Sequence, residues 1–210
     1  YLEPEQEKEN PEKHAKFWTM IKNADGVLVP GGFGNRGVEG KMCAARYCRE
    51  NGKPYLGICL GLQIAVIDFA RDILGKAGAN STEFDEATPH PAVIFMPEGS
   101  RTHMGGTMRL GSRQTNLQTK DCDAYRLYGG DMQIHERHRH RYEVNPEMVE
   151  ELEAAGMRFV GKDTEGERME IIELTGHPYF FGTQYHPEFQ SRPNRPSPPF
   201  VGLIEAALKA

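Results

Sequence analysis

A cysteine between two glycines is the residue of this sequence best placed to do covalent chemistry. In Gly57-Ile-Cys-Leu-Gly61, Cys59 follows an apolar run at 55–58 and precedes a helix expected from about Leu62. A sharp turn from strand to helix lifts one side chain above a sheet edge, in a strained backbone that only small neighbours permit. The first N–H groups of the helix point at the sulfur and stabilise a thiolate and an oxyanion. A lone cysteine is usually buried and inert, but the flanking glycines favour a nucleophile.

A thiol nucleophile needs a base, and the base needs a group that orients it. Both residue types occur in His186-Pro-Glu188, directly after an aromatic-rich strand expected at 179–185. In an α/β sheet, chemistry collects at the carboxyl ends of the strands. Glu188 can then accept from one imidazole nitrogen of His186 while the other faces Cys59. A His-Pro-Glu turn alone indicates only a surface loop, but with the cysteine turn it predicts a triad.

The elements that must position these residues alternate between helix and strand. We expect helices at 15–21, 38–51, 62–74, 121–128, 147–155 and 200–209, and strands at 27–29, 55–58, 93–96, 157–161, 169–174 and 179–185. Residues 1–14 are polar and predict a loop or an exposed helix start, 98–111 a loop, and 192–199 a proline-rich connector. This order predicts an α/β fold with a mixed, mostly parallel sheet, helices on both faces and an antiparallel segment near the C-terminus.

The composition narrows the function classes. A chain of 210 residues with 38% hydrophobic and 26% charged residues is typical of one soluble globular domain. The net charge of −5 argues against a general nucleic-acid or membrane surface, and no apolar run reaches transmembrane length. The cysteines Cys43, Cys48, Cys59 and Cys122 form no metal or redox spacing, so we expect reduced thiols, a cytoplasmic location and no metal.

The segment His135 to Arg141, in which arginine and histidine alternate, has several interpretations. Three histidines could hold a metal, but the flanking arginines would repel a cation. A phosphate or RNA patch is conceivable, although the chain is acidic overall and no aromatic residues are interleaved.

Beyond the triad, three longer stretches carry a resemblance. Gly57–Gln63 and His186–Glu188 resemble the class I (triad) glutamine amidotransferases, which have a flavodoxin-like fold. The stretches 29–40, 105–111 and 136–144 are similar to the C-terminal glutaminase domain of the CTP synthase family. The resemblance covers essentially the whole chain, as one domain at 1–210. The family opens with a strand-helix unit that has no counterpart here, so we expect further chain upstream.

The resemblance implies roles for individual residues. It makes Cys59, His186 and Glu188 catalytic and gives the oxyanion the N–H groups of Gly32 and Leu60. The implied glutamine-binding residues are Gly32, Leu60, Gln63, Glu83, Arg141 and Tyr142. A carboxylate at Glu83 suits the α-ammonium of an amino acid, because charge-assisted contacts are strong. On this interpretation the basic segment faces an acidic partner domain or a nucleotide.

The resemblance also implies partners. Ammonia from L-glutamine would pass to an upstream synthetase domain, which aminates UTP to CTP with ATP and Mg²⁺. GTP would act as an activator, with Phe33, Arg36, Gly37, Arg109 and the 137–141 arginines as candidate contacts, and the whole enzyme would be a tetramer. This chain has no P-loop and no cofactor of its own. A γ-glutamyl hydrolase, another class I amidotransferase, a non-enzymatic regulatory domain and an RNA-binding module remain as alternatives.

Overall fold

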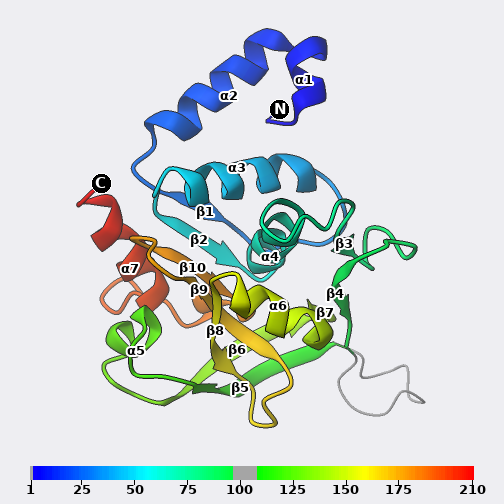
Figure 1. Cartoon of the computed structure of the whole chain (residues 1–210). Coiled ribbons are helices and arrows are strands. Elements are labelled where there is room, and N and C mark those ends of the chain that lie inside the picture. Colours follow the sequence, from blue (N-terminus) through cyan, green and yellow to red (C-terminus); the bar gives the residue numbers. More distant parts are fainter. Residues whose placement is uncertain (1, 97–107) are drawn as a thin grey trace.

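The main sheet of the molecule brings the predicted nucleophile and base to one edge. The computed structural model describes residues 2–96 and 108–210. Its main sheet runs in the order β1-β2-β10-β9-β8-β5-β6 (Figure 1). The strands are β1 (Val27–Val29), β2 (Tyr55–Ile58), β5 (Arg109–Leu117), β6 (Gln133–His140), β8 (Met157–Lys162), β9 (Met169–Leu174) and β10 (Phe180–Thr183). A smaller sheet joins β3 (Asn80–Ser81), β4 (Pro91–Phe95) and β7 (Tyr142–Val144).

The main sheet is mixed, as the sequence predicts. β1 and β10 each pair with β2 in parallel. From β10 to β6 the described pairs are antiparallel, so the antiparallel part is larger than the sequence analysis expects. Because β2 and β10 are parallel neighbours, their carboxyl ends meet at the same edge, and there Cys59 follows β2 and His186 lies three residues after β10.

Helices cover both faces of this sheet, which confirms that part of the predicted fold. On one face, α3 (Val38–Glu50), α4 (Leu60–Asp72) and α6 (Val149–Ala154) share a core with Tyr55 and Phe180. On the other face, α5 (Asp123–Leu127) and α7 (Pro198–Ala207) share a core with Leu56 and Phe181. Neighbouring residues of a strand point to opposite faces of the sheet. The strands β2 and β10 therefore pack against helices on both faces (Figure 1).

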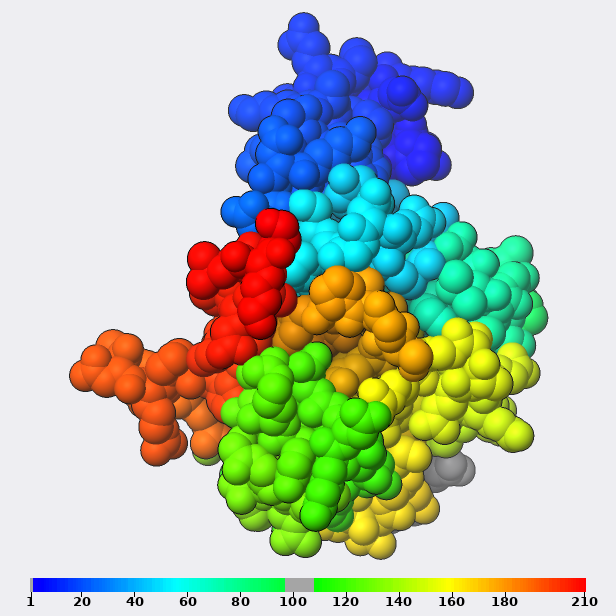
Figure 2. All heavy atoms as spheres, turned by 60° about the vertical axis from the view of Figure 1, so that its left-hand side comes forward, coloured from blue at the N-terminus to red at the C-terminus, as the bar shows by residue number. Residues whose placement is uncertain are grey.

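The N-terminal residues form two helices, α1 (Pro4–Glu9) and α2 (Pro11–Asn23). Each begins with a proline, whose fixed φ suits the first helical position. Neither helix has a buried residue, and the two form a blue lobe that stands apart in Figure 2. The lobe contacts the body through Glu3, which accepts from the Gly40 N–H, and through the Trp18 ring edge on Tyr47.

Several predicted boundaries are wrong. The helix expected from Leu62 begins at Leu60, directly after the turn. The helix expected at 147–155 divides into a 3₁₀ turn, Pro146–Met148, and α6. Of the loop expected at 98–111, residues 98–107 lie outside the described part, and 109–111 begin β5. In the part of the chain that the structure describes, no helix is long and apolar enough to cross a bilayer.

Candidate active site

The turn at Cys59 is strained and closely packed. Cys59 precedes α4 with φ of +51°, and among the described residues it alone combines a positive φ with a side chain. A Cβ on Gly57 would stand 2.6 Å from the carbonyl of Gly61, and a Cβ on Gly61 would overlap the carbonyl oxygen of Val29. Both glycines are therefore required by the close approach of strand and helix. The predicted strand–turn–helix around Cys59 is present.

His186 and Glu188 form a hydrogen-bonded pair beside this turn. Nδ1 of His186 lies 2.7 Å from Oε1 of Glu188. The backbone N–H of His186 donates to the carbonyl of Arg137 at 2.8 Å. A Cβ on Gly31 would stand 2.8 Å from Cε1 of His186 and 3.5 Å from Cβ of Cys59, so one glycine touches both side chains. Nε2 of His186 is buried and has no hydrogen-bond partner within the described structure. That nitrogen is therefore available to take a proton.

Burial favours the protonated form of the Cys59 thiol in the ligand-free structure. Burial raises its pKa to about 12, and the negative charges of Glu188 and Glu83 raise it further, against hydrogen bonds from the Leu60 N–H and Gln184. The Leu60 N–H at the start of α4 lowers the thiol pKa, in the direction that the sequence analysis expects, but desolvation outweighs this donor in the ligand-free structure. At Glu188 burial also favours the neutral form, but the hydrogen bond with His186 prevails and lowers the carboxyl pKa.

A narrow cleft of about 30 Å³ opens beside the sulfur. Its lining residues are Gly32, Phe33, Cys59, Gln63, Glu83, His140, Arg141 and Tyr142. Five of the six predicted glutamine-binding residues are among them, and the sixth, Leu60, directs its backbone N–H at the sulfur. The cleft is therefore narrow, and its lining brings side chains of both charges close to the sulfur.

Two contacts fix the walls of this cleft. Oε1 of Glu83 accepts from the Gly34 N–H at 3.2 Å and so ties the glycine-rich loop to the segment after β3. Nε2 of Gln63 donates to the carbonyl of Tyr142 at 2.7 Å and so ties α4 to β7. The charged carboxylate of Glu83 and the guanidinium of Arg141 both line the cleft, so its electrostatics suit a ligand that carries an ammonium and a carboxylate.

Sequence reasoning missed three residues at the site: Gly31, His140 and Gln184. Gly31 sits beside the predicted Gly32, and only the packing against His186 distinguishes them. His140 occupies a buried position of β6, which alternates exposed and buried along its length. Nε2 of Gln184 lies 3.6 Å from the sulfur of Cys59. The two-residue periodicity of 134–140 was the one available signal, and it points to His140.

The side chains of the basic segment, residues 135–141, alternate between the two sides of strand β6. His138 and His140 face inward, whereas His135, Arg137 and Arg139 are exposed. The three histidines therefore do not converge, and the described residues contain no group of three or more His, Cys, Asp or Glu that could hold a metal. Around the two inward imidazoles lies a buried ionic cluster, formed by Arg109, Glu143, Arg168 and Glu170.

The residues predicted to meet GTP lie in two different environments. Phe33 is 56% exposed, and the guanidinium of Arg139 stands over its ring at 5.5 Å. Arg36 and Gly37 are exposed in the loop before α3. Arg109 instead faces the interior, where it donates to Glu170 at 2.8 Å. Phe33, Arg36 and Gly37 are therefore exposed to solvent, whereas Arg109 is buried.

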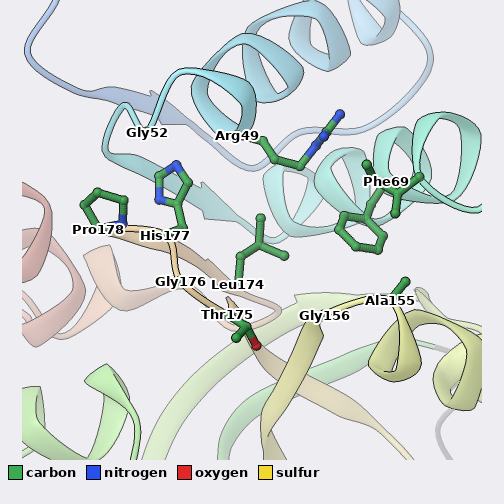
Figure 3. A pocket seen from close by; sticks show the side chains of 11 residues that line it. Arg49, Gly52, Phe69, Ala155, Gly156, Leu174, Thr175, Gly176, His177 and Pro178 are labelled. Atoms are coloured by element: carbon green, nitrogen blue, oxygen red, sulfur yellow. The ribbon is translucent and has the colours of Figure 1, made fainter.

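Larger cavities lie away from this chemistry. One of about 400 Å³ is shown in Figure 3, lined by Arg49, Phe69 and the turn at 174–178 before β10. It therefore lies at the opposite end of β10 from His186. None of its lining residues is a cysteine or serine. The cleft at Cys59 is much smaller, but it contains the strained cysteine and five of the six predicted glutamine-binding residues, so volume does not identify the site.

The fold and the site together define the class of the protein. A strained cysteine on a strand–helix turn, a His-Glu pair just after the parallel neighbour strand, and cleft residues of both charges are typical of a triad amidotransferase. The family model for glutamine amidotransferase class-I matches residues 4–206. The chain belongs to the class I glutamine amidotransferase family.

Comparisons with individual proteins narrow the assignment. The chain is 56% identical to CTP synthase 1-A of Xenopus laevis and 55% identical to CTP synthase 1 of Homo sapiens, each over 99% of this chain. A solved Trypanosoma brucei CTPS glutaminase domain with bound acivicin matches with a TM-score of 0.88 at 38% identity, over 97% of this chain and 78% of that one. This homology places the chain with the glutaminase domains of CTP synthases. It spans about a third (35%) of the length of the curated relatives.

Proposed function

We propose that this chain hydrolyses L-glutamine to glutamate and ammonia through Cys59, His186 and Glu188. The observation that carries the proposal is the common edge of β2 and β10, where the strained cysteine and the His186–Glu188 pair flank one glycine, Gly31. The homology to CTP synthase glutaminase domains supports the same reaction. A non-enzymatic domain would not need a strained backbone at a cysteine.

The chemistry follows from the protonation states. Nε2 of His186 takes the proton of the Cys59 thiol as the sulfur attacks the carbon of the substrate side-chain amide. The resulting oxyanion accepts from the N–H groups of Gly32 and Leu60, each worth about 3 kcal/mol. The C–N bond then breaks, and His186 returns the proton to the departing ammonia. A water molecule, deprotonated by His186, hydrolyses the thioester and restores the thiol. Glu188 orients the imidazole and stabilises its charged form throughout.

The cleft residues divide the recognition of glutamine among them. The Glu83 carboxylate would hold the α-ammonium group, and Arg141 with Tyr142 would line the far side of the substrate. Gln63 lies nearest to the reacting end, since it contacts the side chain that reaches the sulfur. The reaction requires no metal or cofactor in this mechanism.

The remainder of the proposal concerns the whole enzyme. The ammonia would supply a synthetase domain that aminates UTP to CTP with ATP and Mg²⁺, in a cytoplasmic tetramer. GTP would bind near Phe33, Arg36 and Gly37, with a purine on the Phe33 ring and arginine forks on the phosphates. In the intact polypeptide, Phe33→Ala should weaken GTP activation of glutamine-dependent synthesis and spare ammonia-dependent synthesis. Equal GTP activation in the variant would exclude Phe33 from the effector site.

Ammonia release from glutamine tests the central claim. Cys59→Ala should abolish ammonia release. Cys43→Ala is the control: this cysteine lies on α3, away from the turn at Cys59, so its loss should leave ammonia release unchanged. A glutamine-like diazo ketone should label Cys59 alone among the four cysteines, and acivicin should protect it. Full hydrolysis by the Cys59→Ala protein would refute the mechanism. Salt-dependent RNA binding with no glutaminase activity would favour the alternative based on the basic segment.

A further inference from the structure

Two buried glutamines connect the wall of the cleft to the sulfur of Cys59. Gln63 is 3% and Gln184 1% exposed. Nε2 of Gln63 donates to the Tyr142 carbonyl at 2.7 Å and to Oε1 of Gln184 at 3.2 Å. Nε2 of Gln184 in turn lies 3.6 Å from Sγ of Cys59, within hydrogen-bond range for sulfur. The amides thus form a continuous chain from β7 through α4 and β10 to the nucleophile.

The direction of every hydrogen bond in this chain follows from one backbone carbonyl. A carbonyl oxygen can only accept, so the Gln63 atom next to Tyr142 must be its NH₂ group. The second proton of that group points at Gln184, whose facing atom must therefore be the carbonyl oxygen. This leaves the NH₂ group of Gln184 toward Cys59. The positions of oxygen and nitrogen in both side-chain amides are therefore assigned from the hydrogen bonds, although the two atoms have nearly the same shape.

We propose that Gln184 stabilises the Cys59 thiolate by donating Nε2–H to Sγ, and that Gln63 holds the Gln184 amide in this orientation. The proposal rests on the nucleophilic role of Cys59 stated above. A thiol is a weak acceptor and a thiolate a strong one. The hydrogen bond therefore strengthens when the S–H proton moves to Nε2 of His186, and it selectively favours the reactive state.

The burial of the thiol makes this donor important. Because burial disfavours the thiolate, each donor that reaches the sulfur has a large effect on how often the reactive form occurs. The helix N-terminus contributes the Leu60 N–H, and Gln184 approaches from β10. The backbone of Gln184 is itself fixed, since its N–H donates to the carbonyl of Glu170 at 2.9 Å. A packing role alone would not require the amide to face the sulfur.

Alkylation of Cys59 by iodoacetamide tests the proposal without glutamine. The measurement is the second-order rate constant at the Cys59 peptide, by mass spectrometry, in the intact polypeptide. Gln184→Met keeps the side-chain length and removes the donor, so the rate at about pH 8 should fall by about tenfold, the effect of one pKa unit. In glutamine hydrolysis, kcat should fall similarly while KM changes less than about twofold. Gln114→Met, at a glutamine bonded to Asn116 on β5, is the control and should match wild type.

The isosteric variant Gln184→Glu separates the hydrogen bond from packing. It preserves shape, but its ionised carboxylate repels a thiolate, so its deficit should grow as the pH rises and its carboxyl ionises. Alkylation of Gln184→Met or Gln184→Glu at the wild-type rate would overturn the proposal. So would a deficit that is equal in both variants and independent of pH. Because alkylation needs no substrate, these outcomes are distinct from a failure of Cys59-dependent hydrolysis in wild type, which would refute the proposed function instead.

Discussion

The backbone of Gly31 lies directly against the imidazole of His186. A Cβ on Gly31 would stand 2.8 Å from Cε1 of His186, closer than carbon atoms approach without one of them moving. The ring is also held by Glu188, whose Oε1 lies 2.7 Å from Nδ1, and by the Phe189 ring, which stacks on it with 5.1 Å between the ring centroids. The imidazole of His186 can therefore occupy this position only because Gly31 has no side chain.

We expect Gly31→Ala to lower kcat for glutamine hydrolysis by about 100-fold, the effect of a displacement of about 1 Å at a reacting group. The fold should persist, because the clash falls on a side chain at the sheet edge. Ammonia release and thermal unfolding are the measurements. Gly26→Ala is the matched control, since its Cβ would press on Leu203 at 3.2 Å and not on the base. Wild-type kcat in Gly31→Ala would show that His186 has room to move.

The raised pKa of Cys59 predicts how its reactivity depends on pH. Only the thiolate is alkylated, so a pKa of about 12 places the reactive form above the neutral range. In the absence of glutamine, the alkylation rate should rise about tenfold per pH unit up to about pH 10, whereas an ordinary thiol levels off near its pKa of about 8.5. A plateau below about pH 8 would contradict the burial of a neutral thiol.

The same shift affects stability, with a sign that can be worked out. The unfolded chain releases the thiol proton near its ordinary pKa, while the folded chain retains it up to a higher pH. The folded state therefore loses stability as the pH rises between the two values. Cys48, whose pKa burial also raises to about 12, contributes in the same direction. Chemical denaturation at several alkaline pH values measures the loss, and Cys48→Ala should reduce its slope.

Glu83 has an observed contact with the Gly34 N–H and a proposed one with the substrate ammonium, and two substitutions can separate them. Glu83→Gln removes the charge but keeps an oxygen for the Gly34 N–H, so KM for glutamine should rise by about tenfold or more with little change in kcat. Glu83→Ala removes both the charge and the tie to the loop, so kcat should fall as well. Steady-state kinetics distinguish the two patterns. An unchanged KM in Glu83→Gln would place the ammonium of the substrate elsewhere.

Arg109 should matter for stability before it matters for an effector. Its guanidinium is buried against Glu170, which also accepts a short hydrogen bond from Thr115. Arg109→Ala would remove the Arg109 cation from the buried Glu170 carboxyl, whose pKa burial raises to about 7. Where that carboxyl is ionised, above about pH 7, the cost should be about 3–5 kcal/mol in the free energy of unfolding. Urea denaturation measures it, and the exposed Arg36→Ala should show almost no change. Unchanged stability together with lost GTP activation would instead make Arg109 an effector contact.

The sequence predicts the local features of the site and misses the ones that depend on pairing. Gly57 can be recognised because the close approach that it permits, to Gly61, lies within five residues, and Gly61 can be recognised only because it completes the same short motif. His140 and Gln184 reach the site only through the register of β5 with β6 and of β10 with its neighbours, which no short-range pattern determines. β5 itself was missed because its inward residues include polar ones, such as Arg109 and Thr115, whose partner Glu170 lies 55 or more positions away.

The positive φ of Cys59 lowers the thermodynamic stability of the fold at the residue that is proposed to be the nucleophile. A residue with a side chain in such a conformation costs about 1–3 kcal/mol, and the surrounding fold must supply that energy. Glycine has no such penalty, so Cys59→Gly should unfold at a higher temperature than Cys59→Ala, although both are inactive. Selection for a more heat-resistant chain would therefore favour losing the nucleophile. A lineage that keeps the strained cysteine does so because the reaction, and not the fold, requires it.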